Sequence, residues 1–260
     1  MFTDNPFSGL AAQVPPMVMQ AFVAVMIAFV VLGTLFDMTH KKSARYFFNN
    51  WRAAGKRGSR KVGAGEMGGI AIKTAIEGLT SGEFCNPRRR LAHLVTMYGF
   101  LLYVVTTVIL VFAYPTPDMP APEILPRLWY LGAMLVCVGN IWFWFFIRVD
   151  VVAEGKSPFR VVRADLFVLS LLANGALALV WSWLQSDGSE WTDAALGLYL
   201  FSTVVLFGAI PWSKFSHMFF KPAAALQKHL EESNGFRSNL PLPADKPAAF
   251  GSARTPPKHY

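Results

Sequence analysis

Cysteine and charge are scarce in this sequence of 260 residues, and their scarcity excludes several classes of protein. Its two cysteines, Cys85 and Cys137, cannot form a disulfide framework. No Cys-x-x-Cys and no cluster of His and Cys occurs, which excludes an iron–sulfur cluster or structural zinc held by this chain alone. Lysine and arginine are missing from the first 36 residues, so we expect no cleavable signal peptide and an apolar first segment that stays in the mature protein.

The composition that remains is typical of a membrane protein. Hydrophobic residues make up 53% of the chain, charged residues 15%, and the mean hydropathy is +0.37. Five apolar runs each approach the roughly 20 residues that cross a ~30 Å hydrocarbon core as an α-helix. We therefore expect an all-α polytopic membrane protein, a five-transmembrane-helix bundle, with spans at about residues 17–37, 91–114, 128–147, 164–185 and 194–210.

The distribution of charge predicts the orientation of these spans. With five crossings, 23 of the 24 lysines and arginines fall on one side, and Arg127 is alone on the other side with six of the 16 acidic residues. Positive residues gather on the cytoplasmic side of membrane proteins. We expect the N-terminus outside and the C-terminus inside.

Two segments on the N-terminal side lie outside the spans. Residues 1–16 are expected to be a periplasmic N-terminus, and residues 39–90 a cytoplasmic loop with twelve lysines and arginines. Within that loop, the apolar spacing of residues 67–79 predicts a short interfacial helix. The basic residues from Arg52 to Lys61 predict a docking surface for lipid or protein, and not for nucleic acid, because the topology already explains the charge.

The C-terminal part begins at a proline. Pro211 removes a backbone donor, so the helix before it should end or kink there. Residues 211–232 are then expected to form a cytoplasmic helical extension, which ends a membrane domain of residues 17–232. The tail, residues 233–260, is rich in proline and small polar residues and is predicted to be disordered.

A glycine-rich motif in the basic loop does not indicate nucleotide binding. Residues 63–68 spell Gly-x-Gly-x-x-Gly, the fingerprint of dinucleotide binding. Because no apolar strand precedes it, we interpret the motif as a flexible basic loop. We identify no catalytic residue, and whether the chain is an enzyme stays open. A transport path is disfavoured, because the spans carry almost no ionisable residue at mid-depth.

Two histidines are candidate ligands of a haem. His93 begins the second span, and His217 follows the fifth among phenylalanines that would exclude water. Two imidazoles from facing helices are common axial ligands of haem b, although an isolated interfacial histidine is the plainer interpretation of each. Candidate propionate partners at the same level are Arg88, Arg89, Arg90 and Lys214. His40 is interpreted as an ordinary residue next to the membrane.

The chain resembles the five-helix membrane cytochromes b, the family of the respiratory nitrate reductase gamma subunit and of the membrane subunits of heterodisulfide reductase and the quinone-interacting complexes of sulfur metabolism. Residues 84–100 and 211–222, which contain His93 and His217, carry this resemblance. It implies one haem b whose iron is held by His93 and His217 near the cytoplasmic face. Two-haem members place a further histidine pair where this chain has Tyr103 and Tyr199, so we expect no outer haem.

The chain lacks the iron–sulfur domain that the sulfur-complex subunits carry. It therefore looks most similar to the membrane subunit or anchor associated with adenylylsulfate reductase in sulfur oxidisers. This resemblance implies a multi-pass protein of the bacterial inner membrane that links a cytoplasmic iron–sulfur flavoprotein oxidoreductase to the quinone pool, with quinone or quinol as an exchangeable partner. The alternative is a haem-free structural membrane anchor for that soluble enzyme.

Overall fold

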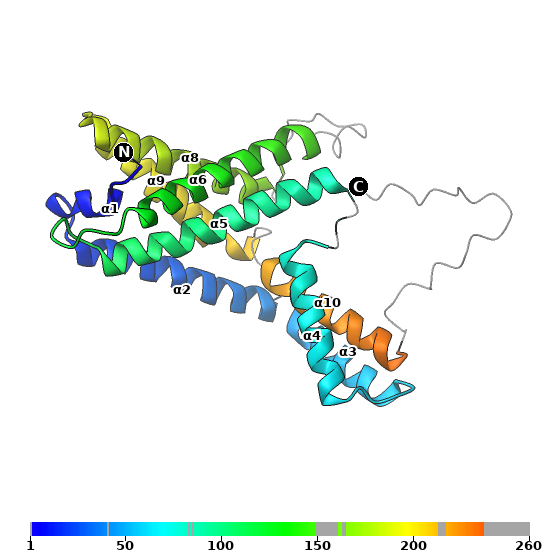
Figure 1. Ribbon diagram of the computed structural model, residues 1–260. Helices are drawn as coiled ribbons and strands as arrows, with labels where there is room; N and C mark the ends of the chain where they lie inside the picture. Colours follow the sequence, from blue (N-terminus) through cyan, green and yellow to red (C-terminus); the bar gives the residue numbers. More distant parts are fainter. Residues whose placement is uncertain are drawn as a thin grey trace. The chain divides into compact units, whose positions relative to one another are not determined.

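We describe a computed structural model of the chain, covering residues 2–40, 42–82, 84, 86–148, 161–162, 165–212 and 217–236. The described residues form helices joined by turns and contain no strand, which confirms the all-α prediction (Figure 1). Most of the predicted disordered tail, residues 237–260, lies outside them. So do Lys214, Cys85 and most of the second basic segment, residues 149–160.

Four helices are long and apolar enough to cross a membrane, so the chain has the character of a membrane protein. They are α2 (Pro16–His40), α5 (Pro87–Ala113), α6 (Ile124–Trp142) continued by the π-helical η2 (Phe143–Arg148), and α8 (Leu166–Asp187). The fifth expected span corresponds to α9 (Thr192–Gly208), an apolar helix of 17 residues. Such a helix is about 25 Å long, slightly short of a ~30 Å core, so a fifth crossing stays a prediction.

The chain divides into two compact units, which we describe separately. The bundle unit comprises Met1–Leu35 and Leu91–Phe215, and the α3–α4–α10 unit comprises Phe36–Arg90 and Ser216–Tyr260. Helices α2 and α5 contribute residues to both units.

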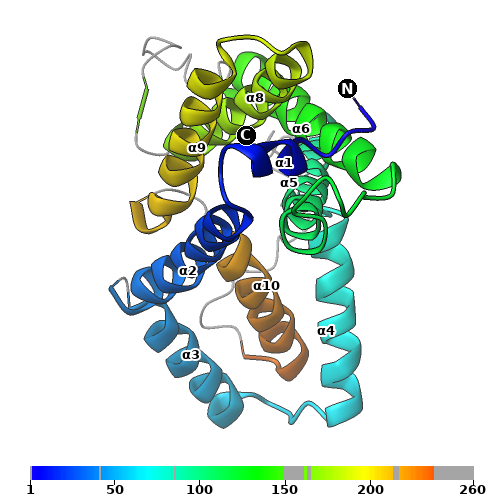
Figure 2. The same cartoon turned by 90° about the vertical axis from the view of Figure 1, so that its left-hand side faces the viewer.

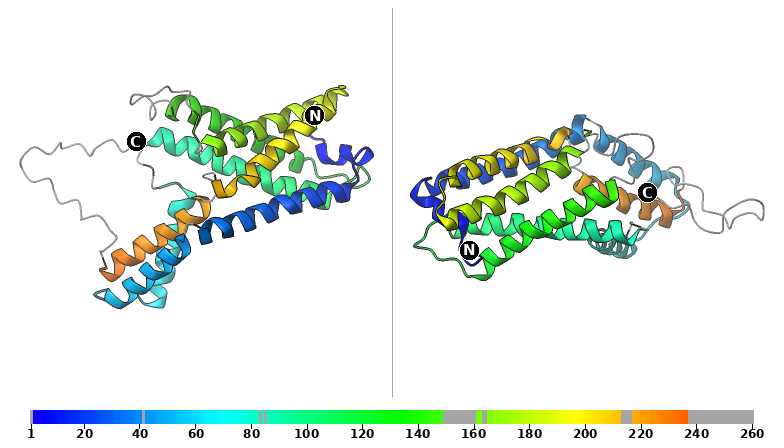
Figure 3. Two further views of the ribbon diagram at one scale, coloured as in Figure 1. Left: turned by 180° about the vertical axis from the view of Figure 1, so that it is seen from behind. Right: turned by 90° about the horizontal axis from the view of Figure 1, so that it is seen from above.

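Small residues bring the helices of the bundle unit together. A Cβ placed on Gly132 of α6 would lie 2.6 Å from the backbone nitrogen of Tyr103 on α5, and one placed on Gly99 would lie 2.9 Å from the backbone of α6. Gly139 meets the face of Ala92 and Thr96 in the same way. The small-residue face of α5 therefore packs closely against α6. Figure 3 shows α8 between α6 and α9.

Aromatic side chains fill the bundle beyond these glycines. Trp129 and Tyr130, which their place near the end of a span suggests as interfacial anchors, are instead 0% and 1% exposed. Phe7 of the short helix α1 (Pro6–Gly9) packs edge-to-face on Trp129, and the Trp129 indole donates a hydrogen bond to Thr107 Oγ1 at 2.9 Å. The anchor prediction is wrong for these two residues, because the bundle covers both side chains and supplies the Trp129 indole with a hydrogen-bond acceptor.

The expected basic loop is largely helical. It contains α3 (Ser43–Arg57) and α4 (Ala64–Leu79), which confirms a short helix at residues 67–79 and adds one that was not predicted. The prediction of a flexible loop at residues 63–68 is wrong, because Gly63 caps α4 and the rest of the motif forms its first turn. Figure 2 shows α10 (His217–Asn234) between α3 and α4. The Asn234 amide donates to the carbonyl of Ala54, and Phe236 is 6% exposed, so the ordered chain continues past the expected boundary at residue 232.

Candidate functional site

The first turn of α5 combines a cap with three cations. The Asn86 side chain accepts hydrogen bonds from the backbone N–H groups of Arg88 and Arg89 at 3.0 and 3.4 Å, and Pro87 opens the helix. Three arginines at a helix N-terminus oppose the helix dipole, so helix stability does not explain them. Their position at the start of a candidate span suits cations, which gather where membrane spans meet the lipid head groups.

His93 lies one turn further along α5 and is half-buried. Its neighbour Ala92 is 2% exposed and belongs to the face that meets α6. A candidate iron ligand just inside a cationic surface layer suits the chemistry of a haem whose propionates stay at the surface. The role of His93 as a haem ligand stays a prediction.

The other half of the predicted haem site is described only in part. α9 ends at Gly208 and a 3₁₀ turn follows at Ile210–Trp212, so the predicted break at Pro211 is confirmed. His217 is the first residue of α10 and belongs to the α3–α4–α10 unit, whereas His93 belongs to the bundle unit. The side chain of His217 and all of Lys214 lie outside the described residues, and the pairing of His93 with His217 stays a prediction.

Two of the three candidate propionate partners on α5 make other contacts. The Arg90 Nε donates to the carbonyl of Thr80 at 2.9 Å. Arg89 and Lys221 both lie near the ring of Phe84, with their charged groups 5.5 and 5.1 Å from its centroid. Arg88 and Arg90 are exposed, and Arg89 is half-buried.

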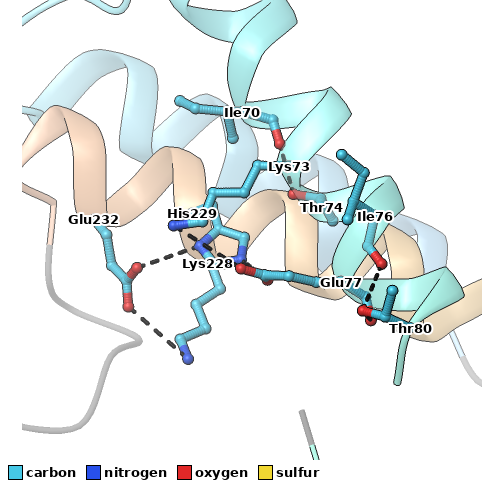
Figure 4. Close-up of polar contacts among 9 residues, drawn as sticks. All are labelled: Ile70, Lys73, Thr74, Ile76, Glu77, Thr80, Lys228, His229 and Glu232. Carbon is cyan, nitrogen blue, oxygen red and sulfur yellow. Dashed lines mark hydrogen bonds and ion pairs between the residues drawn. The ribbon is translucent and has the colours of Figure 1, made fainter. Parts of the chain in front are cut away.

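Two other histidines have structural partners. His40 stacks on Phe36 with ring centroids 5.4 Å apart, consistent with an ordinary residue at the end of α2. His229 Nε2 lies 2.8 Å from Glu77 Oε2 and joins α10 to α4 (Figure 4).

Tyr103 and Tyr199 meet in the bundle. The Tyr103 hydroxyl donates to the Tyr199 hydroxyl at 2.8 Å, and both side chains are 4% exposed. Trp181 stacks on Tyr199 with an interplanar angle of 7°. Two-haem members of the resembling family have haem-ligating histidines at these two positions. In this chain the two tyrosines bond to each other instead and connect α5 with α9.

A small apolar cavity of about 100 Å³ adjoins this pair, with α2 forming one wall through Met26 and Val30. Asn174 and Thr203 also line it, and the Asn174 amide of α8 donates to Thr203 Oγ1 of α9 at 2.6 Å, a hydrogen bond between helices. The amide of buried Asn140, by contrast, donates to the carbonyl of Val136 within its own helix.

A buried ion pair joins the third and fourth apolar helices. Arg148 Nε donates to Asp165 Oδ1 at 2.8 Å, and the two residues are 5% and 7% exposed. The guanidinium also lies 4.1 Å from the ring centroid of Trp144. Sequence analysis missed this pair, although an arginine that ends one span and an aspartate that begins the next were its signal.

The outer side of α3 is a cationic face. Arg45, Arg52 and Lys56 recur at helical spacing within about 40° around the axis, all three are exposed, and α3 contains no acidic residue. Arg60, part of the predicted docking surface, has a different role. Its guanidinium donates to Glu66 Oε2 at 2.9 Å and to the carbonyl of Ser233 at 2.7 Å, so it holds the linker after α3 against the end of α10.

No protein-family model and no solved structure matches the chain. Among curated proteins it is similar to citrate utilization protein B of Escherichia coli, with 24% identity over 204 residues. The match covers 73% of this chain and 52% of that protein, so the chain spans about half the length of this relative.

Proposed function

We propose that this protein is the membrane subunit that links a cytoplasmic iron–sulfur flavoprotein oxidoreductase, adenylylsulfate reductase, to the quinone pool of the bacterial inner membrane. The redox group would be one haem b near the cytoplasmic face, held by His93 and His217. When bound, such a haem supplies one-electron transfer; the chain's own residues hold it and exclude water around it.

The hydrogen bond between Tyr103 and Tyr199 carries this proposal. In the resembling cytochromes the haem ligands come from the second and fifth helices. The bond supports that arrangement here, because it joins α5 to α9. It also supports a single haem, since two bonded tyrosines occupy the positions of an outer pair.

The cationic face of α3 is the proposed docking surface for the soluble enzyme. Opposite charge steers association and its effect weakens as salt screens it, so an acidic partner surface fits best. To test it, we compare Arg52→Gln/Lys56→Gln with a control pair of exposed cations in the same unit, Lys73→Gln/Lys228→Gln. The first pair should reduce co-purification of the enzyme and its dependence on salt. Equal losses in both pairs would contradict docking through α3.

The haem is tested by absorption spectroscopy of the purified, dithionite-reduced protein. Loss of an axial imidazole leaves the iron without a strong ligand, so His93→Ala and His217→Ala should each abolish the low-spin α-band. His40→Ala is the control, because His40 stacks on Phe36, and it should leave the band intact. Two haems per chain would contradict the single site.

A haem-free anchor is the second candidate. The contacts of Arg89 and Arg90 with Phe84 and Thr80 favour it, since those arginines then serve the chain and not a propionate. The anchor function would be supported if the wild-type protein showed no haem absorption and still retained the enzyme at the membrane.

The name of the similar protein mentions citrate, but the described helices do not support a path that carries citrate across a membrane. A carboxylate anion would need cations along its path, and the charged residues of the described apolar helices lie near their ends.

A further inference from the structure

The helix α4 has an exposed face without any charged residue. Ile72, Ile76 and Leu79 are 65%, 56% and 53% exposed and lie within about 60° of one another around the helix axis. Around Gly65, Gly68 and Gly69, an added Cβ would meet no atom within 4 Å, so no described part of the chain packs on these three glycines. We call Ile72, Ile76 and Leu79, with these three glycines, the aliphatic face of α4.

The opposite side of α4 is already in use. Thr74 is buried, Ile70 is half-buried, and Glu77 pairs with His229 of α10 (Figure 4). This packed side lies roughly 160° around the helix from the aliphatic face. Contact with α10 therefore leaves the aliphatic face uncovered, and an exposed apolar stripe of this kind marks an interaction surface.

The end of α4 is tied to the start of a candidate membrane span. The carbonyl of Thr80, directly after α4, accepts a hydrogen bond from Arg90 in the first turn of α5. Arg88, Arg89 and Arg90 are cations of the kind that lie at the level of the lipid phosphates. Leu79 therefore lies next to Thr80, whose carbonyl is bonded to one of these arginines.

The composition of the aliphatic face fits lipid better than protein. Protein interfaces are enriched in tyrosine, tryptophan, methionine and arginine at their centres and have a polar rim. The aliphatic face contains isoleucine, leucine and glycine only. The charged residues of α4 lie away from this face: Glu66 and Lys73 are exposed on a flank where they can remain in water, and Glu77 faces α10.

We propose that α4 lies in the interface of the same bilayer that α5 enters, with its aliphatic face among the upper acyl chains. This places α10, and behind it the cationic face of α3, on the water side of the unit. The inference rests on the geometry of α4 and its tie to Arg90, and it holds whether or not the protein binds haem.

The test uses the full chain in nanodiscs of phosphatidylethanolamine and phosphatidylglycerol. Single cysteines replace Ile72, Ile76 or Lys73 in a chain with Cys85→Ser and Cys137→Ser, and each carries a nitroxide spin label. Oxygen concentrates in lipid, whereas a nickel chelate stays in water. The ratio of oxygen to nickel collision rates should be several-fold higher at 72 and 76 than at 73, the exposed control on the polar flank.

Two outcomes would overturn the proposal. Nickel access at 72 and 76 equal to that at 73 would place the aliphatic face in water. Exclusion of both oxygen and nickel from 72 and 76 would show a protein cover, either a second copy of this chain or the soluble enzyme. Dilution to one chain per nanodisc distinguishes these two covers.

Discussion

The bundle unit and the α3–α4–α10 unit are both helical, yet different interactions join their helices. The bundle relies on close contacts at glycines, stacked aromatic rings and uncharged hydrogen bonds such as that between Tyr103 and Tyr199. The other unit relies on charged groups and helix ends, such as His229 with Glu77 and Arg60 with Glu66.

The difference matches the residues available to each unit, because the candidate membrane spans belong mostly to the bundle unit and most of the charged residues of the described helices to the other. In a bilayer, lipid chains are as apolar as the helix surfaces, so close packing and uncharged hydrogen bonds bring helices together. In water, charged pairs remain affordable but contribute little when exposed. We therefore expect substitutions in the bundle to affect stability strongly and substitutions of exposed charges in the other unit to affect it weakly.

The ion pair of Arg148 and Asp165 is the exception to this comparison, because it is charged and yet buried in the bundle unit. Arg148→Met leaves Asp165 buried without its main partner, so the free energy of unfolding should fall by about 3–5 kcal/mol. Arg127→Met is the matched control at the other end of α6, because its pair with Glu123 is exposed, and it should change stability by less than about 1 kcal/mol. Thermal unfolding in detergent measures both. Equal losses of stability in the two variants would show that burial does not determine how much an ion pair contributes.

The next effect concerns the glycine contacts. Gly132→Ala places a methyl group against the backbone of Tyr103 and forces α5 and α6 apart, which should cost about 1–3 kcal/mol. Gly197→Ala is the control, since its Cβ would meet nothing within 4 Å and alanine favours a helix. The melting temperature should fall for the first variant and hold or rise for the second.

A smaller effect is expected at the tyrosine pair. Removing either hydroxyl breaks the same bond, so Tyr103→Phe and Tyr199→Phe should not be additive. Their double-mutant cycle should give a coupling energy of about 0.5–1 kcal/mol. Additive losses would show that the two hydroxyls act independently.

The smallest effect is in the α3–α4–α10 unit and depends on pH. Hydrogen bonding from Arg60 holds the pKa of Glu66 below its ordinary value of 4.5. A lowered carboxyl pKa stabilises the pair above that ordinary value, and the stabilisation is lost as pH falls through the lower folded value. A spin label at Gly63→Cys should therefore become more mobile in acid. With Glu66→Gln the label should already be mobile at pH 7 and change little.

Sequence analysis predicted the helical class and four of the candidate spans to within a few residues of their observed ends. Long apolar runs must form helices in a membrane, because only intrahelical bonds satisfy the backbone there. It also predicted the break at Pro211, because proline lacks a backbone donor, and the helix at residues 67–79, because its apolar residues recur at helical spacing. It missed α3, because a high density of cations suggested a loop, while the helical spacing of Phe47, Trp51 and Ala54 remained unused.

The candidate site was predictable only as positions along the chain. Hydropathy, charge and helical spacing are properties of neighbouring residues, so the sequence alone determined that this is a helical membrane protein and that His93 lies just inside a cationic turn. Only the tertiary structure decided that Tyr103 bonds Tyr199, that Trp129 is buried, that Arg148 pairs with Asp165 and that Arg60 binds within the chain. Each of these depends on which distant segments meet, and many pairings of the same apolar helices satisfy the same composition.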